Sequence, residues 1–112
     1  MMNYDKENIF AKILNEEIPC EKVFENDYVL SFKDINPKAK IHLLIIPKEP
    51  FVDISDFLHN ADTIYQTNFW KSVDEIITVL ELRDKGFQIK SHKGKDGGQE
   101  VFHFHLHILS DA

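Results

Sequence analysis

Three histidines near the end of the chain, His103, His105 and His107, are separated from one another by single large apolar residues. Side chains of a β-strand point alternately to its two faces, so this spacing places all three imidazoles on one face. The apolar residues between and beside them then share the other face: Phe102, Phe104, Leu106 and Ile108. A helix would scatter both sets around its axis. The pattern therefore predicts a strand with one apolar face and one face equipped for chemistry.

The residues alone leave three interpretations of this face open. The first is an exposed strand face that carries histidines by chance. The second is a metal site, because the imidazoles of a His-x-His pair project the same way about 6–7 Å apart, although a third ligand in line is poorly placed for a tetrahedron. The third is nucleophilic or acid–base catalysis, in which one imidazole attacks while its neighbours orient it and supply protons.

The loop before the histidines spans residues 94–99 and reads GKDGGQ. It lacks the Gly-Lys-Ser/Thr ending of a P-loop. The adjacent glycines at positions 97 and 98 let backbone N–H groups approach an anion closely, although such a pair is also common in ordinary turns. A phosphate site has a use for this property and a metal site has none. The loop therefore favours phosphate chemistry.

Composition and charge narrow the class of protein. A chain of 112 residues, 43% of them hydrophobic, is expected to form one domain over residues 1–112 with one modest core. The net charge of −6 argues against a nucleic-acid partner, which needs a basic face. The single cysteine, Cys20, excludes an intrachain disulfide and fits a reducing compartment. The longest apolar run, residues 43–46, is far too short to span a membrane, so we expect a soluble cytoplasmic protein without a membrane partner.

The order of the predicted elements indicates an α+β fold. Residues 9–17 carry a helical apolar stripe that ends before Pro19, and residues 61–84 carry a longer stripe, which Gly86 is expected to close. Strands are expected at residues 22–24, 28–33, 41–46 and 87–90 and in the histidine segment. The third of these is apolar enough to be buried on both faces. We therefore predict an antiparallel sheet of about five strands with the helices on one face.

The histidine segment, GGQEVFHFHLHIL at residues 97–109, closely resembles the signature of the histidine triad (HIT) family. Its Gly-Gln-Glu-Val form is most similar to bacterial members of the histidine triad nucleotide-binding (Hint) branch. Residues 9–19, 32–37 and 42–48 resemble the opening helix, the ribose-binding segment and the central strand of that branch. The resemblance implies a single HIT domain with a five-stranded antiparallel sheet, one short helix and one long helix.

The resemblance also implies an enzyme that acts on nucleotides without a cofactor. The family binds purine nucleoside monophosphates joined to a leaving group, and the middle histidine, here His105, attacks the α-phosphate. A nucleotidyl-histidine intermediate forms, and water then releases the monophosphate. Members of the Hint branch hydrolyse AMP-amine phosphoramidates and related adenylates. They are homodimers paired through the long helix and a nearby strand.

The other site residues follow from the same resemblance. His107 is expected to hydrogen-bond the phosphate and to help protonate the leaving group, His103 to orient the nucleophile, and His42 to extend the hydrogen-bond relay behind it. Asp34 is expected to hold the ribose hydroxyls. The apolar slot for the base is expected to comprise Phe10, Ile18, Phe32 and Ile35. Contacts to the phosphate or leaving group are expected from His92, Gln99 and the region of Val101.

Plainer interpretations of these residues stay open. Asp34 fits an ordinary turn residue, His42 a core histidine, and the members of the apolar slot an ordinary core. Three other functions are alternatives: a nucleotide-binding protein with little catalysis that acts through a partner, a dinucleoside polyphosphate hydrolase, and a histidine metal-binding domain.

The sequence departs from the pattern of the family at Asn8, Ala11 and His92. Some bacterial members bind structural zinc through an N-terminal Cys-x-x-Cys, but Asn8 and Ala11 occupy the matching positions, so no metal is expected. His92 stands where the Hint branch usually has Asn, near the phosphate.

The imidazole of His92 can change its charge within the physiological pH range, whereas an amide cannot. We therefore expect the activity of the wild-type protein to show an extra titration near neutral pH that the substitution His92→Asn removes. The measurement is the rate of phosphoramidate hydrolysis against pH for both proteins. A variant with an unchanged pH profile would contradict this expectation.

Overall fold

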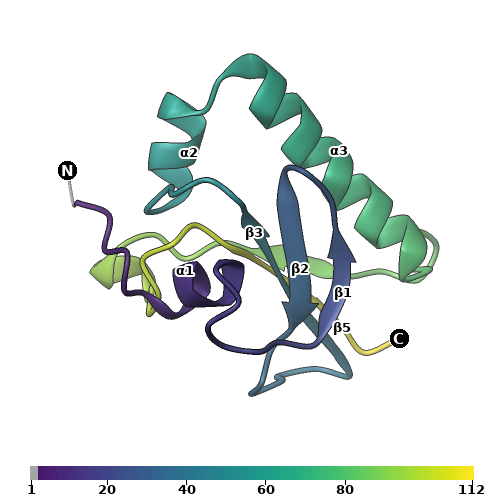
Figure 1. Ribbon diagram of the computed structural model, residues 1–112. Helices are drawn as coiled ribbons and strands as arrows, with labels where there is room; N and C mark the ends of the chain where they lie inside the picture. Colours follow the sequence, from purple (N-terminus) through teal and green to yellow (C-terminus); the bar gives the residue numbers. More distant parts are fainter. Residues whose placement is uncertain (1–2) are drawn as a thin grey trace.

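The computed structural model describes residues 3–112, which form a five-stranded antiparallel sheet (Figure 1). The strands are β1 (Lys22–Glu25), β2 (Val29–Lys33), β3 (Ile41–Pro47), β4 (Gln88–Lys90) and β5 (Leu106–Ser110). Their order in the sheet is β1-β2-β3-β5-β4, so the last strand of the chain lies between β3 and β4. The predicted sheet of about five antiparallel strands is confirmed.

Three α-helices lie in the described part of the chain: α1 (Ile9–Leu14), α2 (Ile54–Asn60) and α3 (Thr63–Val79). The first and last are the predicted short and long helices, and α2 is an addition to the prediction. Asp53 begins α2 by accepting a hydrogen bond from the Asp56 N–H at 2.8 Å, and Asp62 begins α3 by accepting one from the Tyr65 N–H at 2.7 Å. Because each cap begins its own helix, residues 54–79 form two helices and not one continuous helix. No helix in residues 3–112 has the length and apolar character needed to cross a membrane.

The long helix ends at a glutamate in the left-handed conformation. Glu81 has a φ of 58°, and the N–H groups of Glu81 and Leu82 donate to the carbonyls of Thr78 and Ile77 at 3.0 and 3.1 Å. This is the Schellman pattern of helix termination, and α1 ends in the same way. Leu82 is fully buried and anchors the turn in the core. The prediction that Gly86 closes the helix is wrong, because a buried leucine after the turn decides where the helix stops.

The sheet is covered on both faces (Figure 1). In the central strand β3, Leu43 and Ile45 pack into one core with residues of α2 and α3. Leu44 and Ile46 pack into a second core with residues of α1. The prediction that the helices lie on one face is therefore wrong, because a strand that is apolar on both faces needs cover on both.

The histidine segment is only partly a strand. β5 begins at Leu106, so His107 lies in the sheet, whereas His103 and His105 precede it. Three of the four apolar residues belong to the core beneath α3: Phe104, Leu106 and Ile108. The fourth, Phe102, is half-buried and lies outside that core. The histidines lie on the α1 side, where the ring centroid of Phe10 is 4.9 Å from that of His105. The predicted alternation of faces is thus present, but the hydrogen-bond ladder of the sheet holds only the last of the three histidines.

Candidate active site

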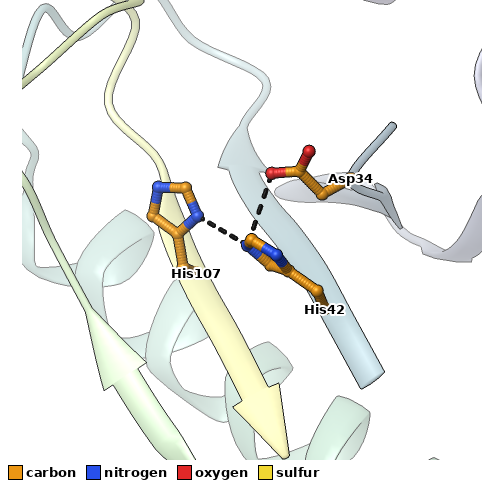
Figure 2. A group of neighbouring side chains, drawn as sticks. All are labelled: Asp34, His42 and His107. Carbon is orange, nitrogen blue, oxygen red and sulfur yellow. Dashed lines mark hydrogen bonds and ion pairs between the residues drawn. The ribbon is translucent and has the colours of Figure 1, made fainter. Parts of the chain in front are cut away.

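Two histidines and an aspartate meet on neighbouring strands of the sheet (Figure 2). His42 lies on β3 and His107 on β5, and Nε2 of His42 is 3.0 Å from Nδ1 of His107. Asp34 follows the last residue of β2, and its Oδ2 lies 3.3 Å from Nε2 of His42. Nε2 of His42 is therefore shared between a carboxylate and an imidazole.

The backbone determines which nitrogen of His42 carries the proton. The N–H of Lys38 donates to Nδ1 of His42 at 3.0 Å, so neutral His42 has its proton on Nε2. That proton faces Asp34 and His107, which makes Nδ1 of His107 an acceptor. Neutral His107 then carries its own proton on Nε2. The relay that starts at His42 thus reaches His107, whereas the sequence prediction placed it behind His105.

His105 is oriented by one hydrogen bond to the backbone. Its Nδ1 lies 2.7 Å from the carbonyl oxygen of His103, and Nδ1 must carry the proton because a carbonyl only accepts. Nε2 of neutral His105 is then an unprotonated lone pair. Burial is the main cause that lowers the pKa of His105, and the hydrogen bond to His103 opposes it. The ring is therefore neutral at pH 7, the form that acts as a nucleophile or base.

His103 is fully buried and is held at both nitrogens of its ring. Its Nε2–H donates to the carbonyl oxygen of Pro47 at 2.9 Å, and its Nδ1 accepts a hydrogen bond from the phenol of Tyr4 at 2.6 Å. Burial lowers the pKa of His103 to about 4. Sequence reasoning missed Tyr4, because the two residues are 99 positions apart and no local spacing connects them.

His107 is half-buried beside three other imidazoles. Burial, followed by the charges of His105, His42 and His92, lowers the pKa of His107 to about 4. The ring centroids of His105 and His92 lie 5.1 and 5.2 Å from that of His107. The negative charge of Asp34 opposes these effects, because it raises the pKa of His107. An anion placed among these rings would favour protonated His107 in the same way, because it would supply an opposite charge.

The glycine loop is attached to this cluster through His92. Nδ1–H of His92 donates to the carbonyl oxygen of Gly97 at 2.9 Å, which leaves Nε2 as the free nitrogen of the ring. Gln99 closes the loop from inside. Its amide donates to two backbone carbonyls, including that of Val101 at 2.9 Å, and its oxygen accepts from the Gly94 N–H at 2.8 Å. The Gln99 side chain therefore supports the loop with both its donors and its acceptor.

Three of the four residues predicted for the apolar slot lie together. Phe10, Ile18 and Phe32 belong to one cluster with Val101, and the rings of Phe10 and Phe32 meet edge to face with centroids 5.6 Å apart. Ile35 lies outside this cluster in the turn between β2 and β3, where 87% of it is exposed. The structure thus brings an aromatic surface to the histidines but places Ile35 at the edge of the site.

A cavity of about 740 Å³ lies apart from the histidine cluster. It opens between α2 and the segments on either side of the glycine loop, and its lining includes Asp53, His59, Lys93 and Phe102. Phe102 precedes His103 and takes the opposite side of the chain. None of the five clustered histidines of the described chain lines this cavity, so it is not part of the candidate site.

Asp34, His42 and His107 are also placed to hold a metal ion, since one donor atom from each lies within 4.8 Å of the others. Carboxylate oxygen and imidazole nitrogen are ordinary zinc ligands. A metal ion there would have to displace the Nε2 proton of His42, which already faces two acceptors.

The positions that match the N-terminal Cys-x-x-Cys of zinc-binding relatives have a different use in this chain. Asn8 caps α1 by accepting a hydrogen bond from the Ala11 N–H at 2.9 Å.

The chain is similar to known proteins over most of its length. The HIT domain family profile matches residues 15–112. Protein HitA of Neisseria gonorrhoeae is 45% identical over 104 residues, which cover 90% of this chain and 92% of that protein. A HIT family hydrolase from Clostridium thermocellum has a TM-score of 0.86 at 30% identity, with 96% of this chain and 93% of that chain covered. A histidine triad nucleotide-binding protein from Candida albicans has a TM-score of 0.80 at 32% identity, with 91% and 73% covered.

The fold and the comparisons define a class of hydrolase-like proteins with a nucleotide-related function. The chain belongs to the HIT domain family, and its five-stranded sheet with helices is the fold of its solved neighbours. The resemblance in the histidine segment is therefore confirmed.

Burial should keep His103 and His107 neutral far below the ordinary imidazole pKa of 6.5, and their ring signals in an NMR titration are expected to have midpoints near 4. The unfolded chain takes up these protons near pH 6.5 and the folded chain only near pH 4. The free energy of unfolding is therefore expected to be highest above about pH 6.5 and to fall as the pH is lowered toward about 4.

Urea denaturation at several pH values measures this dependence. His59→Gln, which removes an exposed histidine of α2, is the matched control and should leave the dependence unchanged. Midpoints of both rings near 6.5 would contradict the expectation.

Proposed function

We propose that this protein is a nucleoside phosphoramidase-type hydrolase, in which His105 attacks the α-phosphorus of a purine nucleoside monophosphate joined to an amine. The observation that carries the proposal is the 2.7 Å hydrogen bond from Nδ1 of His105 to the carbonyl oxygen of His103. It leaves Nε2 of His105 as a free lone pair in a buried, neutral ring. Adenylates, which have an oxygen in the leaving group, fit the same chemistry.

In the first step, Nε2 of His105 forms a bond to phosphorus while the bond from phosphorus to the amine nitrogen breaks. Binding of the phosphate anion favours the imidazolium form of His107. His107 then gives its Nε2 proton to the leaving amine and becomes neutral. The products are the free amine and a nucleotidyl-histidine, so one difficult displacement is divided into two easier ones.

In the second step, water attacks the same phosphorus. After the first step His107 keeps its proton on Nδ1, so its unprotonated Nε2 accepts a proton from the water. The bond between phosphorus and Nε2 of His105 then breaks. The nucleoside monophosphate leaves, and His105 regains its lone pair on Nε2 with the proton still on Nδ1. His103 thus keeps one tautomer of His105 through both steps.

The relay behind His107 supports its role as the acid and base. While His107 is neutral, His42 donates from Nε2 toward Nδ1 of His107, which directs Nε2 of His107 away from the relay. Once His107 is an imidazolium, its Nδ1 also carries a proton, and the Nε2–H of His42 is left to Asp34. Asp34 lies beside the same proton of His42. The carboxylate of Asp34 is assigned to the ribose hydroxyls, because a carboxylate accepts two hydrogen bonds from a cis-diol.

The base is assigned to the apolar cluster beneath α1. Phe10, Ile18 and Phe32 supply the slot, and Ile35 would cover the base from the exposed turn. An apolar slot recognises shape more than base edges, so it suits purines in general. His92 and the loop that Gln99 supports are assigned to the phosphate or leaving group, together with the region of Val101.

The direct test is the hydrolysis of an adenosine phosphoramidate by His105→Ala. We expect kcat/KM to fall by about 1,000-fold or more, because no nucleophile remains to form the intermediate. Mass spectrometry of the quenched wild-type reaction should detect an adenylylated chain, and the variant should show none. His59→Ala, an exposed histidine of α2, is the matched control and should retain wild-type turnover.

Three outcomes would count against the assignment. Turnover by His105→Ala near the wild-type rate would reject the nucleophile. Binding of AMP by the wild-type protein without turnover would favour a nucleotide-binding protein that acts through a partner. Faster hydrolysis of a dinucleoside polyphosphate than of any phosphoramidate would favour that class of hydrolase.

We further propose a homodimer formed through β4 and α3. β4 is an edge strand of the sheet with all its residues exposed, and an edge strand offers unpaired N–H and C=O groups to another chain. Phe87 and Ile89 add exposed apolar side chains at this edge, 37% and 44% exposed. On α3, Trp70 is at the surface and 38% exposed, whereas Phe69 is fully buried and belongs to the core.

Sedimentation equilibrium tests this assembly. Ile89→Glu should shift the mass from dimer toward monomer, because it would place like charges against each other across the edge strand. Ile9→Glu is the matched control, since Ile9 is 41% exposed but lies on α1. Equal masses for the two variants would argue against β4 as the interface.

A further inference from the structure

We propose that Tyr4 is a positioning residue for the nucleophile: its phenol hydroxyl holds the imidazole of His103, and the backbone of His103 in turn holds His105. The kinetic part of this inference rests on the proposed function, whereas the hydrogen-bond chain does not. Its first hydrogen bond joins Tyr4, near the N-terminus, to His103, which lies 99 positions further along the sequence.

The direction of each hydrogen bond follows from the acceptors. Pro47 offers only a carbonyl oxygen, so Nε2 of His103 must donate to it, at 2.9 Å. Nδ1 of neutral His103 is then a lone pair, and the hydroxyl of Tyr4 must be the donor to it, at 2.6 Å. The carbonyl of His103 accepts from Nδ1–H of His105 at 2.7 Å. Tyr4 therefore stabilises the tautomer of His103 directly and the tautomer of His105 through one intervening residue.

The sheet cannot supply this support by itself. β5 begins at Leu106, so the ladder that pairs it with β3 starts after His105. Next to His103, the N–H of Phe104 donates to the carbonyl of Phe51 at 2.7 Å. The Phe104 N–H shares a planar peptide unit with the His103 carbonyl, so this bond holds one side of that unit. The other support of the carbonyl is the anchored side chain of His103, and Tyr4 provides one of the two hydrogen bonds that hold that side chain.

Burial makes the anchor necessary. His103 is fully buried, and its ring meets that of Tyr4 edge to face with centroids 5.6 Å apart. Among residues 3–112, no buried side-chain nitrogen or oxygen lacks a hydrogen-bond partner. Tyr4→Phe would create one at Nδ1 of His103, and a buried acceptor without a donor is costly enough to change a ring's tautomer or position. Burial also raises the pKa of Tyr4, so the phenol keeps its proton at neutral pH.

The first arm of the test is NMR of the free protein with ¹⁵N-labelled histidine. In Tyr4→Phe, we expect the Nδ1 signal of His103 to move toward that of a lone pair without a donor, and the Nδ1–H signal of His105 to weaken or shift. A fluorotyrosine at position 4 keeps the shape of the side chain and donates more strongly, so it should move the His103 signal in the opposite direction. Unchanged signals in both variants would overturn the proposal.

The second arm is kinetic. We expect kcat of Tyr4→Phe on an adenosine phosphoramidate to fall by about tenfold, with KM changed by less than about twofold. The reason is that the hydrogen bond and the ring contact of Tyr4 both go to His103, a residue not assigned to the nucleotide. Tyr28→Phe is the matched control. It removes a phenol that packs on Tyr65 at the α3 side of the sheet, away from the histidines.

Thermal unfolding of both variants separates positioning from a loss of folded protein. A fall in kcat that matches the unfolded fraction, with an unchanged rate per folded molecule, would overturn the positioning role. A wild-type protein without turnover would overturn the proposed function instead, and the NMR arm would still decide whether Tyr4 holds His103 and His105.

Discussion

The candidate site depends on the hydrogen bond from Nδ1 of His105 to the carbonyl oxygen of His103. An imidazole can attack only with an unprotonated nitrogen, and this bond leaves that nitrogen at Nε2. The bond is useful only if the carbonyl is held still. It lies just before the ladder of β5, so its position comes from the anchored side chain of His103, from the neighbouring N–H of Phe104, and from the strand that follows.

The sheet supplies the rest of the arrangement because its central strands are covered on both sides. The face beneath α2 and α3 forms the larger apolar core. The face beneath α1 carries both a smaller apolar core and the histidines, so aromatic side chains border the imidazoles. The same burial lowers the pKa of His103, His105 and His107 and keeps these rings neutral at pH 7. Neutral rings suit a nucleophile, and a bound phosphate would restore the charge on His107, where a proton is needed.

Much of this arrangement could be predicted from local patterns. The alternation of His103, His105 and His107 with apolar residues assigned the two faces of the segment correctly, because side-chain direction along an extended chain follows from the backbone alone. The continuous apolar run of β3 indicated burial on both faces. The expected positions of the helices were less accurate. An aspartate cap begins α2, a helix that precedes the expected one, and a buried leucine ends α3 before Gly86. Both effects depend on where the chain packs.

The residue types, their spacing, the strand faces and the family could be assigned from the amino-acid sequence alone. The assembled fold was needed to show which nitrogen of each imidazole carries the proton, and that His42 supports His107, 65 positions away. It also brought Tyr4 to His103 and left Ile35 exposed at the edge of the site. The physical reason is that a tautomer is set by the partner each nitrogen meets. Those partners come from distant parts of the chain, which meet only when the sheet and its two covering layers are assembled.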